Sequence, residues 1–356
     1  MSWSNNNIVS IRSEINCLSI LDVSPIQSTN IFRNISERQQ GTESVGSLSW
    51  STNGQSLVYI TGSRIAIIDT NEDGNKQQFR ECASYSSKFG ALATNVVFCR
   101  APNKTNLVAF VDDDGWLYVL RFQHNLSSLE LVHELKVEPN LKALAWSPDG
   151  EILLVGGRKK LLHVFKADSL EIQNEPIPFQ GRIWDIDFIP LSVGSKSLYF
   201  AVALGDYTTV ILDRAMEPKL EISRTLTCRC VKFHPFQPIL AIGDGAGTVA
   251  IIDCDDGEVV MELDLHERVT ALDFSPAGDY LVAGTDACNF ALYESKNFRL
   301  LQEFPSNGRA LSASFSTNGF YLALGSNETS YNMIRLGSLL GTEFIPMNLT
   351  DRKSVV

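Results

Sequence analysis

The side chains that come closest to a catalytic arrangement are three consecutive carboxylates, Asp112, Asp113 and Asp114, followed by Gly115. Paired carboxylates can act as general acid and base, as they do in hydrolases. Consecutive residues of a strand point to opposite faces, so neighbours in this run do not form a matched pair. No G-x-S-x-G nucleophile motif is present either. The run is interpreted as a solvated turn, and no catalytic residue is expected.

Metal-binding spacings are also missing from the sequence. The five histidines are dispersed, without an HxH or HExxH pattern. Cys228 and Cys230 form a C-x-C pair, but zinc needs four ligands and no second pair lies at a suitable spacing. The stretch from Asp69 to Gly74 matches the first half of a calcium loop, yet Arg80 stands where a bidentate Glu is needed. Neither a metal ion nor a cofactor is expected.

The strongest regularity along the chain is a repeat. Eight times an aromatic residue ends a short apolar run, and successive gaps measure 41 to 48 residues. These anchors are Trp3, Trp50, Phe98, Trp146, Phe188, Phe233, Phe274 and Phe315. Self-similarity at this period indicates one supersecondary unit that buries its faces only against neighbouring copies.

Each unit contains four apolar runs separated by turn residues, as in the segments 269–274, 280–285, 289–294 and 299–304. Runs rich in Val, Ile, Leu, Ala and Phe and bounded by Gly, Asp, Asn and Pro predict antiparallel strands. No stretch holds a 3.6-residue period for long, so helices should be nearly absent. The runs are apolar on both faces, which suits sheets packed between other sheets. The fold class predicted is all-β, a propeller of four-stranded antiparallel blades.

The units resemble WD40 repeats. The family's turn phrase is present as Ser147 to Gly150 and, more loosely, as Ser51 to Gly54, Ser275 to Gly278 and Ser316 to Gly319. The turn Asp maps to Asp114, Asp206, Asp244 and Asp286, and the family's His is matched only by His266. The terminal Trp-Asp pair is replaced by Leu21-Asp22, Ile68-Asp69, Leu212-Asp213 and Ile252-Asp253. The resemblance implies a WD40-like propeller and an interaction platform. Its degenerate ending is similar to that of the WD40 domain of anaphase-promoting-complex subunit 4.

The number of blades depends on the first forty residues. The segment from Ser2 aligns with the segment from Ser49, which favours eight units. A seven-bladed ring is the alternative. It would use residues 31–35 as a closing strand and would leave 8–21 as an unexplained apolar hairpin, which is marginally stable alone.

Aligning the repeats on their anchors brings out two rows of residues. Four residues upstream lie Gly46, Thr94, Lys142, Trp184, Arg229, Thr270 and Leu311; six upstream lie Ser44, Leu92, Asn140, Arg182, Thr227, Arg268 and Arg309. Alternation along a strand places both rows near its beginning, around one mouth of a propeller's channel. Arg182, Trp184, Arg229, Arg268 and Arg309 would then converge from four consecutive blades. Arg and Trp are enriched in interface hot spots, so these five predict a docking site for an acidic peptide or partner loop. The alternative is ordinary solvated arginines beside a packed Trp.

Composition limits the kind of partner. The chain of 356 residues has 44% hydrophobic and 20% charged residues, a formal net charge of −11 and a pI near 5.0. An acidic chain is not a general nucleic-acid binder, and the basic run Arg158 to Lys160 is interpreted as a solvated hairpin turn. No signal peptide and no transmembrane segment are seen, and the seven cysteines suit reduced thiols, which predicts a cytoplasmic or nuclear protein.

Residues 1–356 are expected to form a single propeller domain, with a disordered tail at 350–356. The ending Ser354 to Val356 also resembles a ligand of PDZ domains. The function predicted is a non-catalytic scaffold or adaptor that binds a protein or acidic peptide within a multi-protein complex, without a small-molecule ligand. Two alternatives remain open: a subunit of a membrane-coat or vesicle-tethering complex, and a hydrolase on a propeller scaffold.

Overall fold

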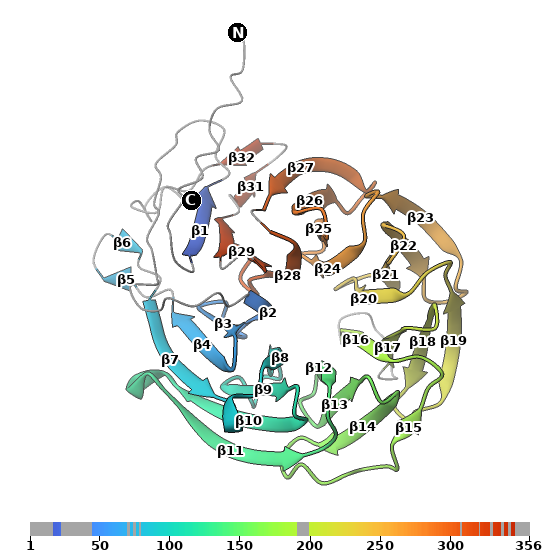
Figure 1. Ribbon diagram of the computed structural model, residues 1–356. Helices are drawn as coiled ribbons and strands as arrows, with labels where there is room; N and C mark the ends of the chain where they lie inside the picture. Colours follow the sequence, from blue (N-terminus) through green and yellow to red (C-terminus); the bar gives the residue numbers. More distant parts are fainter. Residues whose placement is uncertain are drawn as a thin grey trace.

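The strands of the protein form a ring of radially arranged sheets around a central axis (Figure 1). The structure is a computed structural model. It describes residues 17–22, 45–69, 72–73, 76–77, 80–190, 199–306, 308–319, 321–327, 330–335, 338–340 and 343–345. The predicted tail at 350–356, its PDZ-like ending and the anchor Trp3 lie outside these residues.

Six four-stranded sheets are each built from strands within one continuous stretch of the chain. Blade 1 holds β2 (Val45–Trp50), β3 (Ser56–Thr61), β4 (Arg64–Asp69) and β7 (Arg80–Ser86). Blade 2 holds β8 (Ala93–Phe98), β9 (Leu107–Asp112), β10 (Trp116–Gln123) and β11 (Ser128–Lys136). Blade 3 holds β12 (Leu141–Trp146), β13 (Ile152–Gly157), β14 (Leu161–Lys166) and β15 (Ile177–Pro178).

The next three blades repeat this arrangement. Blade 4 holds β16 (Ile183–Phe188), β17 (Tyr199–Leu204), β18 (Thr208–Asp213) and β19 (Pro218–Ser223). Blade 5 holds β20 (Cys228–Phe233), β21 (Ile239–Asp244), β22 (Thr248–Asp253) and β23 (Val259–Asp264). Blade 6 holds β24 (Val269–Phe274), β25 (Tyr280–Thr285), β26 (Asn289–Glu294) and β27 (Arg299–Pro305).

A seventh four-stranded sheet, blade 7, joins distant parts of the chain. It holds β28 (Ala310–Phe315), β29 (Tyr321–Ser326), β30 (Ser330–Arg335) and, pairing in parallel with β30, β1 (Cys17–Asp22). Two short pairs, β5 (Glu72–Asp73) with β6 (Lys76–Gln77) and β31 (Ser338–Leu340) with β32 (Glu343–Ile345), lie outside the blades. The helices of the described residues are two short 3-10 turns, η1 (Lys88–Gly90) and η2 (His124–Leu126), which agrees with the predicted all-β fold.

The ring closes directly between blades 1 and 7, so the prediction of eight units is wrong. The indole Nε1 of Trp50 donates a hydrogen bond to the Ser314 carbonyl at 3.0 Å, and its ring stacks on Tyr321 with centroids 5.7 Å apart. No space for a further blade remains between these contacts. The unit expected around Trp3 instead contributes β1 to blade 7. The closing strand is therefore 17–22, and the segment 31–35 expected in that role lies outside the described residues.

The core lies between the blades, as the apolar strands predicted. The seven anchors within the described residues each end the innermost strand of their blade and are buried. One cluster joins Leu154 and Leu162 of blade 3 to Ile183 and Phe200 of blade 4, and blades 6 and 7 share another. Because each blade covers its neighbour, the innermost strands are held as a rigid wall around the axis.

The predicted Ser-Pro-Asp-Gly turn explains how one blade fits the next. The Ser147 hydroxyl accepts a hydrogen bond from the Ile152 amide at 2.9 Å, and the Gly150 amide donates to the Ser147 carbonyl at 2.8 Å. Gly150 has a φ of +72°, and a Cβ there would lie 2.6 Å from the Ala101 side chain of blade 2. Glycine is thus required both for the turn and for the contact between blades.

The described part of the chain has no helix long and apolar enough to span a membrane.

Candidate functional site

The innermost strands of the blades line a central cavity of about 630 Å³. Its wall includes the whole row four residues upstream of the anchors, from Gly46 to Leu311. Arg182, Arg268 and Arg309, from the row six residues upstream, lie just before β16, β24 and β28 and are exposed. The two rows therefore surround one mouth of the cavity, where the repeat alignment placed them.

Four of the five predicted residues come together at this mouth. The Cζ atoms of Arg182 and Arg229 lie 4.8 Å and 3.9 Å from the centre of the Trp184 indole ring. A guanidinium over an indole is attracted by the negative charge of the ring face. The third arginine, Arg268, is close enough to Arg229 to affect its ionisation. We call Arg182, Trp184, Arg229 and Arg268 the arginine–tryptophan cluster.

Positive charge in this cluster is only partly neutralised. Burial lowers the pKa of Arg229, and the positive charges of Arg268 and Arg182 lower it further, while Asp286 works in the opposite direction. Asp286 itself contacts Arg268, with Nη1 and Oδ2 3.0 Å apart. Within the described residues, neither Arg182 nor Arg229 forms an ion pair. The cluster thus holds three cations against one adjacent carboxylate.

Two buried donors of the cluster have no acceptor in the described part of the chain. They are Nε of Arg229 and Nε1 of Trp184. Buried polar groups in folded proteins are almost always hydrogen-bonded, so such donors call for a ligand or water. An oxyanion fits both the missing acceptors and the excess positive charge, because guanidinium binds carboxylate and phosphate through charge-assisted hydrogen bonds.

Arg309 does not join the cluster. Its side chain is exposed, and its backbone carbonyl accepts a hydrogen bond from the Asn327 amide at 3.1 Å. Among the described residues, the arginines that lie over the Trp184 ring are Arg182 and Arg229, and Arg309 is not one of them. The structure therefore places Arg309 on the same rim as a separate charge.

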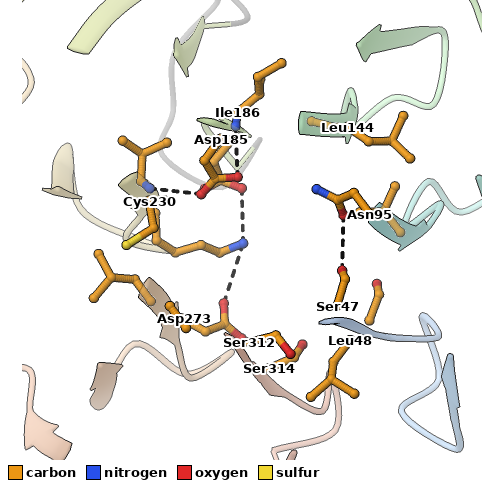
Figure 2. A pocket seen from close by; sticks show the side chains of 18 of the residues that line it. Ser47, Leu48, Asn95, Leu144, Asp185, Ile186, Cys230, Asp273, Ser312 and Ser314 are labelled. Atoms are coloured by element: carbon orange, nitrogen blue, oxygen red, sulfur yellow. Dashed lines mark hydrogen bonds and ion pairs between the residues drawn. The ribbon is translucent and has the colours of Figure 1, made fainter. Parts of the chain in front are cut away.

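Deeper in the cavity lies an ionic network that the sequence analysis missed. The Lys232 ammonium lies 3.1 Å from Oδ1 of Asp187 and 3.5 Å from Oδ1 of Asp273. Figure 2 shows Asp185 and Asp273 on one side of the cavity and Ser47 with Asn95 on the other. Asp187, Lys232 and Asp273 each directly precede an anchor. Charged residues at the same place in three consecutive repeats were a signal that could have revealed the network.

Each carboxylate of this network ties its blade to the next one. Asp185 and Asp187 accept hydrogen bonds from the amides of Val231 and Phe233, at 3.0 and 2.8 Å, and Asp273 accepts one from the Phe315 amide at 2.7 Å. Burial raises the pKa of Asp185 to about 7, although the Val231 amide acts against that rise. The network is thus an internal brace of blades 4 to 7.

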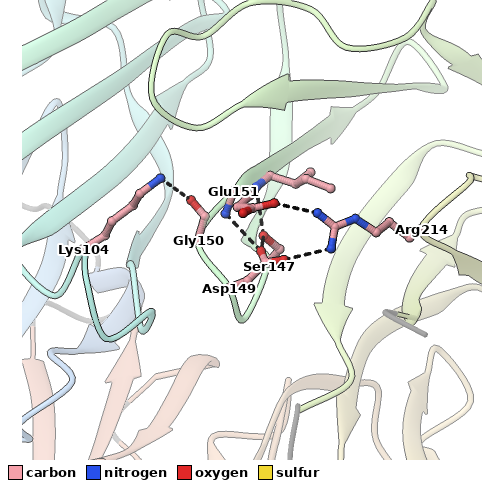
Figure 3. A network of polar contacts seen from close by, with 7 residues as sticks. Lys104, Ser147, Asp149, Gly150, Glu151 and Arg214 are labelled. Atoms are coloured by element: carbon pink, nitrogen blue, oxygen red, sulfur yellow. Dashed lines mark hydrogen bonds and ion pairs between the residues drawn. The ribbon is translucent and has the colours of Figure 1, made fainter. Parts of the chain in front are cut away.

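A second polar network surrounds the turn after β12, at the end of that strand away from the channel mouth, and is also structural (Figure 3). The Lys104 ammonium of blade 2 donates to the Gly150 carbonyl at 2.9 Å. Arg214 of blade 4 donates to Asp149 at 3.1 Å and to Glu151 at 2.7 Å. Burial opposes ionisation of Asp149, but hydrogen bonds from Ser147 and the Glu151 amide, together with Arg214, lower its pKa overall. The turn of blade 3 is thereby fastened on both sides.

The acidic run does not form a catalytic pair. Asp112 is buried and accepts hydrogen bonds from the Trp116 amide at 2.8 Å and the Tyr118 hydroxyl at 3.1 Å, whereas Asp113 contacts Lys142 at 2.8 Å and Asp114 is exposed. The turn Asp of blade 2 is therefore Asp112 and not Asp114. Asp112 is the last residue of β9 and accepts the hairpin amide, whereas Asp114 lies two residues beyond the end of that strand.

The remaining residues singled out in the sequence are two turn aspartates, a basic run and a cysteine pair. Asp206 and Asp244 accept hydrogen bonds from the amides of their own turns, those of Thr208 at 3.3 Å and of Ala246 at 2.9 Å. The basic run Arg158 to Lys160 is exposed between β13 and β14. Burial raises the pKa of Cys228 to about 11, so its thiol stays protonated. No group of three or more potential metal ligands is found in the part of the chain that the structure describes.

Comparison with known proteins adds one family match. Residues 257–290 match the model of the family described as WD domain, G-beta repeat. This segment runs from the turn before β23 through β24 and β25 into β26, and therefore covers one repeat across blades 5 and 6. No curated protein matches the chain. The likeness to anaphase-promoting-complex subunit 4 therefore gains no support.

Proposed function

We propose that this protein is a non-catalytic, WD40-like scaffold that binds an acidic segment of a protein partner at the mouth of its channel. Residues 1–356 would act as one propeller domain in the cytoplasm or nucleus, within a multi-protein complex. The observation that carries the proposal is the arginine–tryptophan cluster, with its excess of positive charge and its two buried donors without acceptors.

A local cationic cluster on an acidic chain favours a selective partner. The formal net charge of −11 repels polyanions such as nucleic acids at long range, so only a segment that reaches the cluster gains from it. Arg182 and Arg229 are already packed on Trp184, which limits the conformational entropy lost on binding. Arg268 and Arg309 would add charge at the rim of the same mouth.

The test is a charge reversal within the cluster. A fluorescent oligoglutamate peptide is titrated against the wild-type protein and against the double variant Arg182→Glu, Arg229→Glu, at several salt concentrations. Removal of two charge-assisted contacts should weaken binding at least about 100-fold, since each is worth roughly 1.5–3 kcal/mol. The matched control is Arg299→Glu, an exposed arginine at the outer strand of blade 6, which should bind like the wild type. Equal affinity of all three proteins would contradict the proposal.

A further inference from the structure

The face of the ring on which this mouth opens carries two exposed apolar side chains, where blade 1 meets blade 2. Phe89 is 87% exposed and Leu92 is 56% exposed. Leu92 lies six residues before its anchor, the repeat position that Arg182, Arg268 and Arg309 occupy in later blades. Because equivalent positions of a repeat lie at equivalent places around the axis, Leu92 belongs to the rim of the same mouth. We call Phe89 and Leu92 the apolar rim.

The loop that carries the apolar rim is firmly held from below. Ser87 is buried, its amide donates to the Ser63 carbonyl at 2.8 Å, and its hydroxyl donates to the Ala91 carbonyl. The Lys88 amide donates to the Tyr118 hydroxyl at 2.9 Å. That hydroxyl in turn donates to Asp112, which is completely buried. The exposure of Phe89 is therefore set by an anchored backbone.

The backbone at Phe89 adopts a conformation that a phenylalanine does not favour. Its φ of 57° and ψ of 15° lie in the left-handed region, and Gly90 follows with a φ of 71°. A glycine at position 89 would adopt this conformation with less strain. A large aromatic side chain that is strained and displayed to water contributes little to folding. Strained residues of this kind cluster at ligand-binding sites.

Basic side chains near the apolar rim already have acidic partners. Lys88 pairs with Glu134 at 2.5 Å and also lies 4.6 Å from the centre of the Trp116 ring. Lys142 pairs with Asp113 at 2.8 Å. This side of the mouth thus offers apolar area without excess charge, while the arginine–tryptophan cluster offers charge from blades 4 to 6. The two sides suit two different parts of one ligand.

We infer that the apolar rim binds a large apolar side chain of the same partner segment whose acidic residues bind the arginine–tryptophan cluster. This inference rests on the proposed function and specifies the partner: an extended acidic segment that also carries a Leu or Phe and lies across the mouth. The segment would bury Phe89 and Leu92, which explains why an anchored loop displays them. Aromatic side chains at such positions are frequent hot spots of interfaces.

The test compares two sets of fluorescent peptides. Both sets share one acidic stretch; the first carries a single Phe moved stepwise along the sequence, and the second carries Ser at the same places. At one spacing, the wild-type protein should bind the Phe peptide about tenfold more tightly than its Ser partner, as expected for burial of one large apolar side chain. The variant Phe89→Gly with Leu92→Ser should bind both peptides of that pair alike.

Two controls separate the possible failures. Phe89→Gly relieves backbone strain, so its unfolding midpoint should match or exceed that of the wild type, which excludes misfolding as the cause of lost discrimination. Leu126→Ser changes an exposed leucine of η2, in a loop on the opposite face, and should leave the discrimination intact. If the wild type binds Phe and Ser peptides equally while Arg229→Glu weakens both, the apolar rim has no such role and the proposed function stands. If Arg229→Glu has no effect on any peptide, the proposed function itself fails.

Discussion

The guanidinium of Arg229 lies 3.9 Å from the centre of the Trp184 ring, although the two residues belong to different blades. Both occupy the same position in their repeats, four residues before the anchor. Equivalent positions in adjacent blades are neighbours at the channel mouth, so a single row of the repeat alignment becomes a continuous surface. The chemistry of that surface is set by which residue each repeat carries there.

Removal of the indole is expected to affect both stability and binding. Trp184→Ala deprives Arg182 and Arg229 of their common contact, and we expect the free energy of unfolding to fall by about 1–2 kcal/mol. Affinity for an acidic peptide should fall as well, because the guanidinium groups are no longer held in place. Urea denaturation and peptide titration measure the two effects. Trp184→Phe keeps an aromatic face and should lose less of both; an alanine variant as stable as the wild type would show that the stack is unimportant.

The partly buried carboxyl of Asp185 should make stability decrease with rising pH. Its folded pKa of about 7 lies above the ordinary value of about 3.9, so the folded state binds more protons than the unfolded state between about pH 4 and pH 7. Ionisation over that window should cost about 2–4 kcal/mol of unfolding free energy. Asp185→Asn removes this loss of stability, because an amide does not ionise.

Urea denaturation at pH 5 and pH 8 tests the effect of Asp185. The wild type should lose stability between pH 5 and pH 8 as Asp185 ionises. The difference in unfolding free energy between the two proteins should therefore shift in favour of the asparagine variant. Other titrating groups, such as Asp149 with its lowered pKa, contribute equally to both proteins and cancel in the difference. A difference that does not change with pH would mean that Asp185 titrates in its ordinary range.

A pair of glycines separates backbone strain from packing between blades. Gly90 and Gly150 have φ values of 71° and 72°, but a Cβ at Gly90 meets nothing within 4 Å, whereas a Cβ at Gly150 meets Ala101 at 2.6 Å. Gly90→Ala should therefore cost about 1–2 kcal/mol of unfolding free energy, from the left-handed backbone alone. Gly150→Ala should cost about 1–3 kcal/mol more, from overpacking against blade 2. Equal losses by chemical denaturation would show that the blades separate without penalty at this turn.

Local patterns predicted the blades because each strand and turn is determined within a few residues. The four runs from 269 to 304 became β24 to β27, and the turn at Ser147 formed as its sequence indicated. The position of Asp112 was misread by two residues, because the length of a tight turn depends on where the preceding strand ends. The number of blades was misread because the pairing of β1 with β30 depends on two segments at opposite ends of the chain.

The alignment of repeats predicted which residues surround the mouth of the cavity, but not how their side chains contact one another. The row containing Trp184 and Arg229 surrounds the mouth as expected, since alternation along a strand fixes which side chains face the axis. Their contact distances and the separation of Arg309 could not be derived, because rotamers of long side chains depend on neighbours in other blades. The ionic network around Lys232 was not predicted, because its residues lie one position before the anchors. The two predicted rows lie four and six positions before them.

The parallel pairing of β1 with β30 also governs the order of assembly on the ribosome. The strand at 17–22 is made more than 300 residues before its partner at 330–335. Six blades can stack in sequence during translation. The ring of blades cannot close with β1 in place until residues 330–335 have been made. Nascent chains halted before residue 330 would consequently leave the early strand unmatched, a ready target for chaperones.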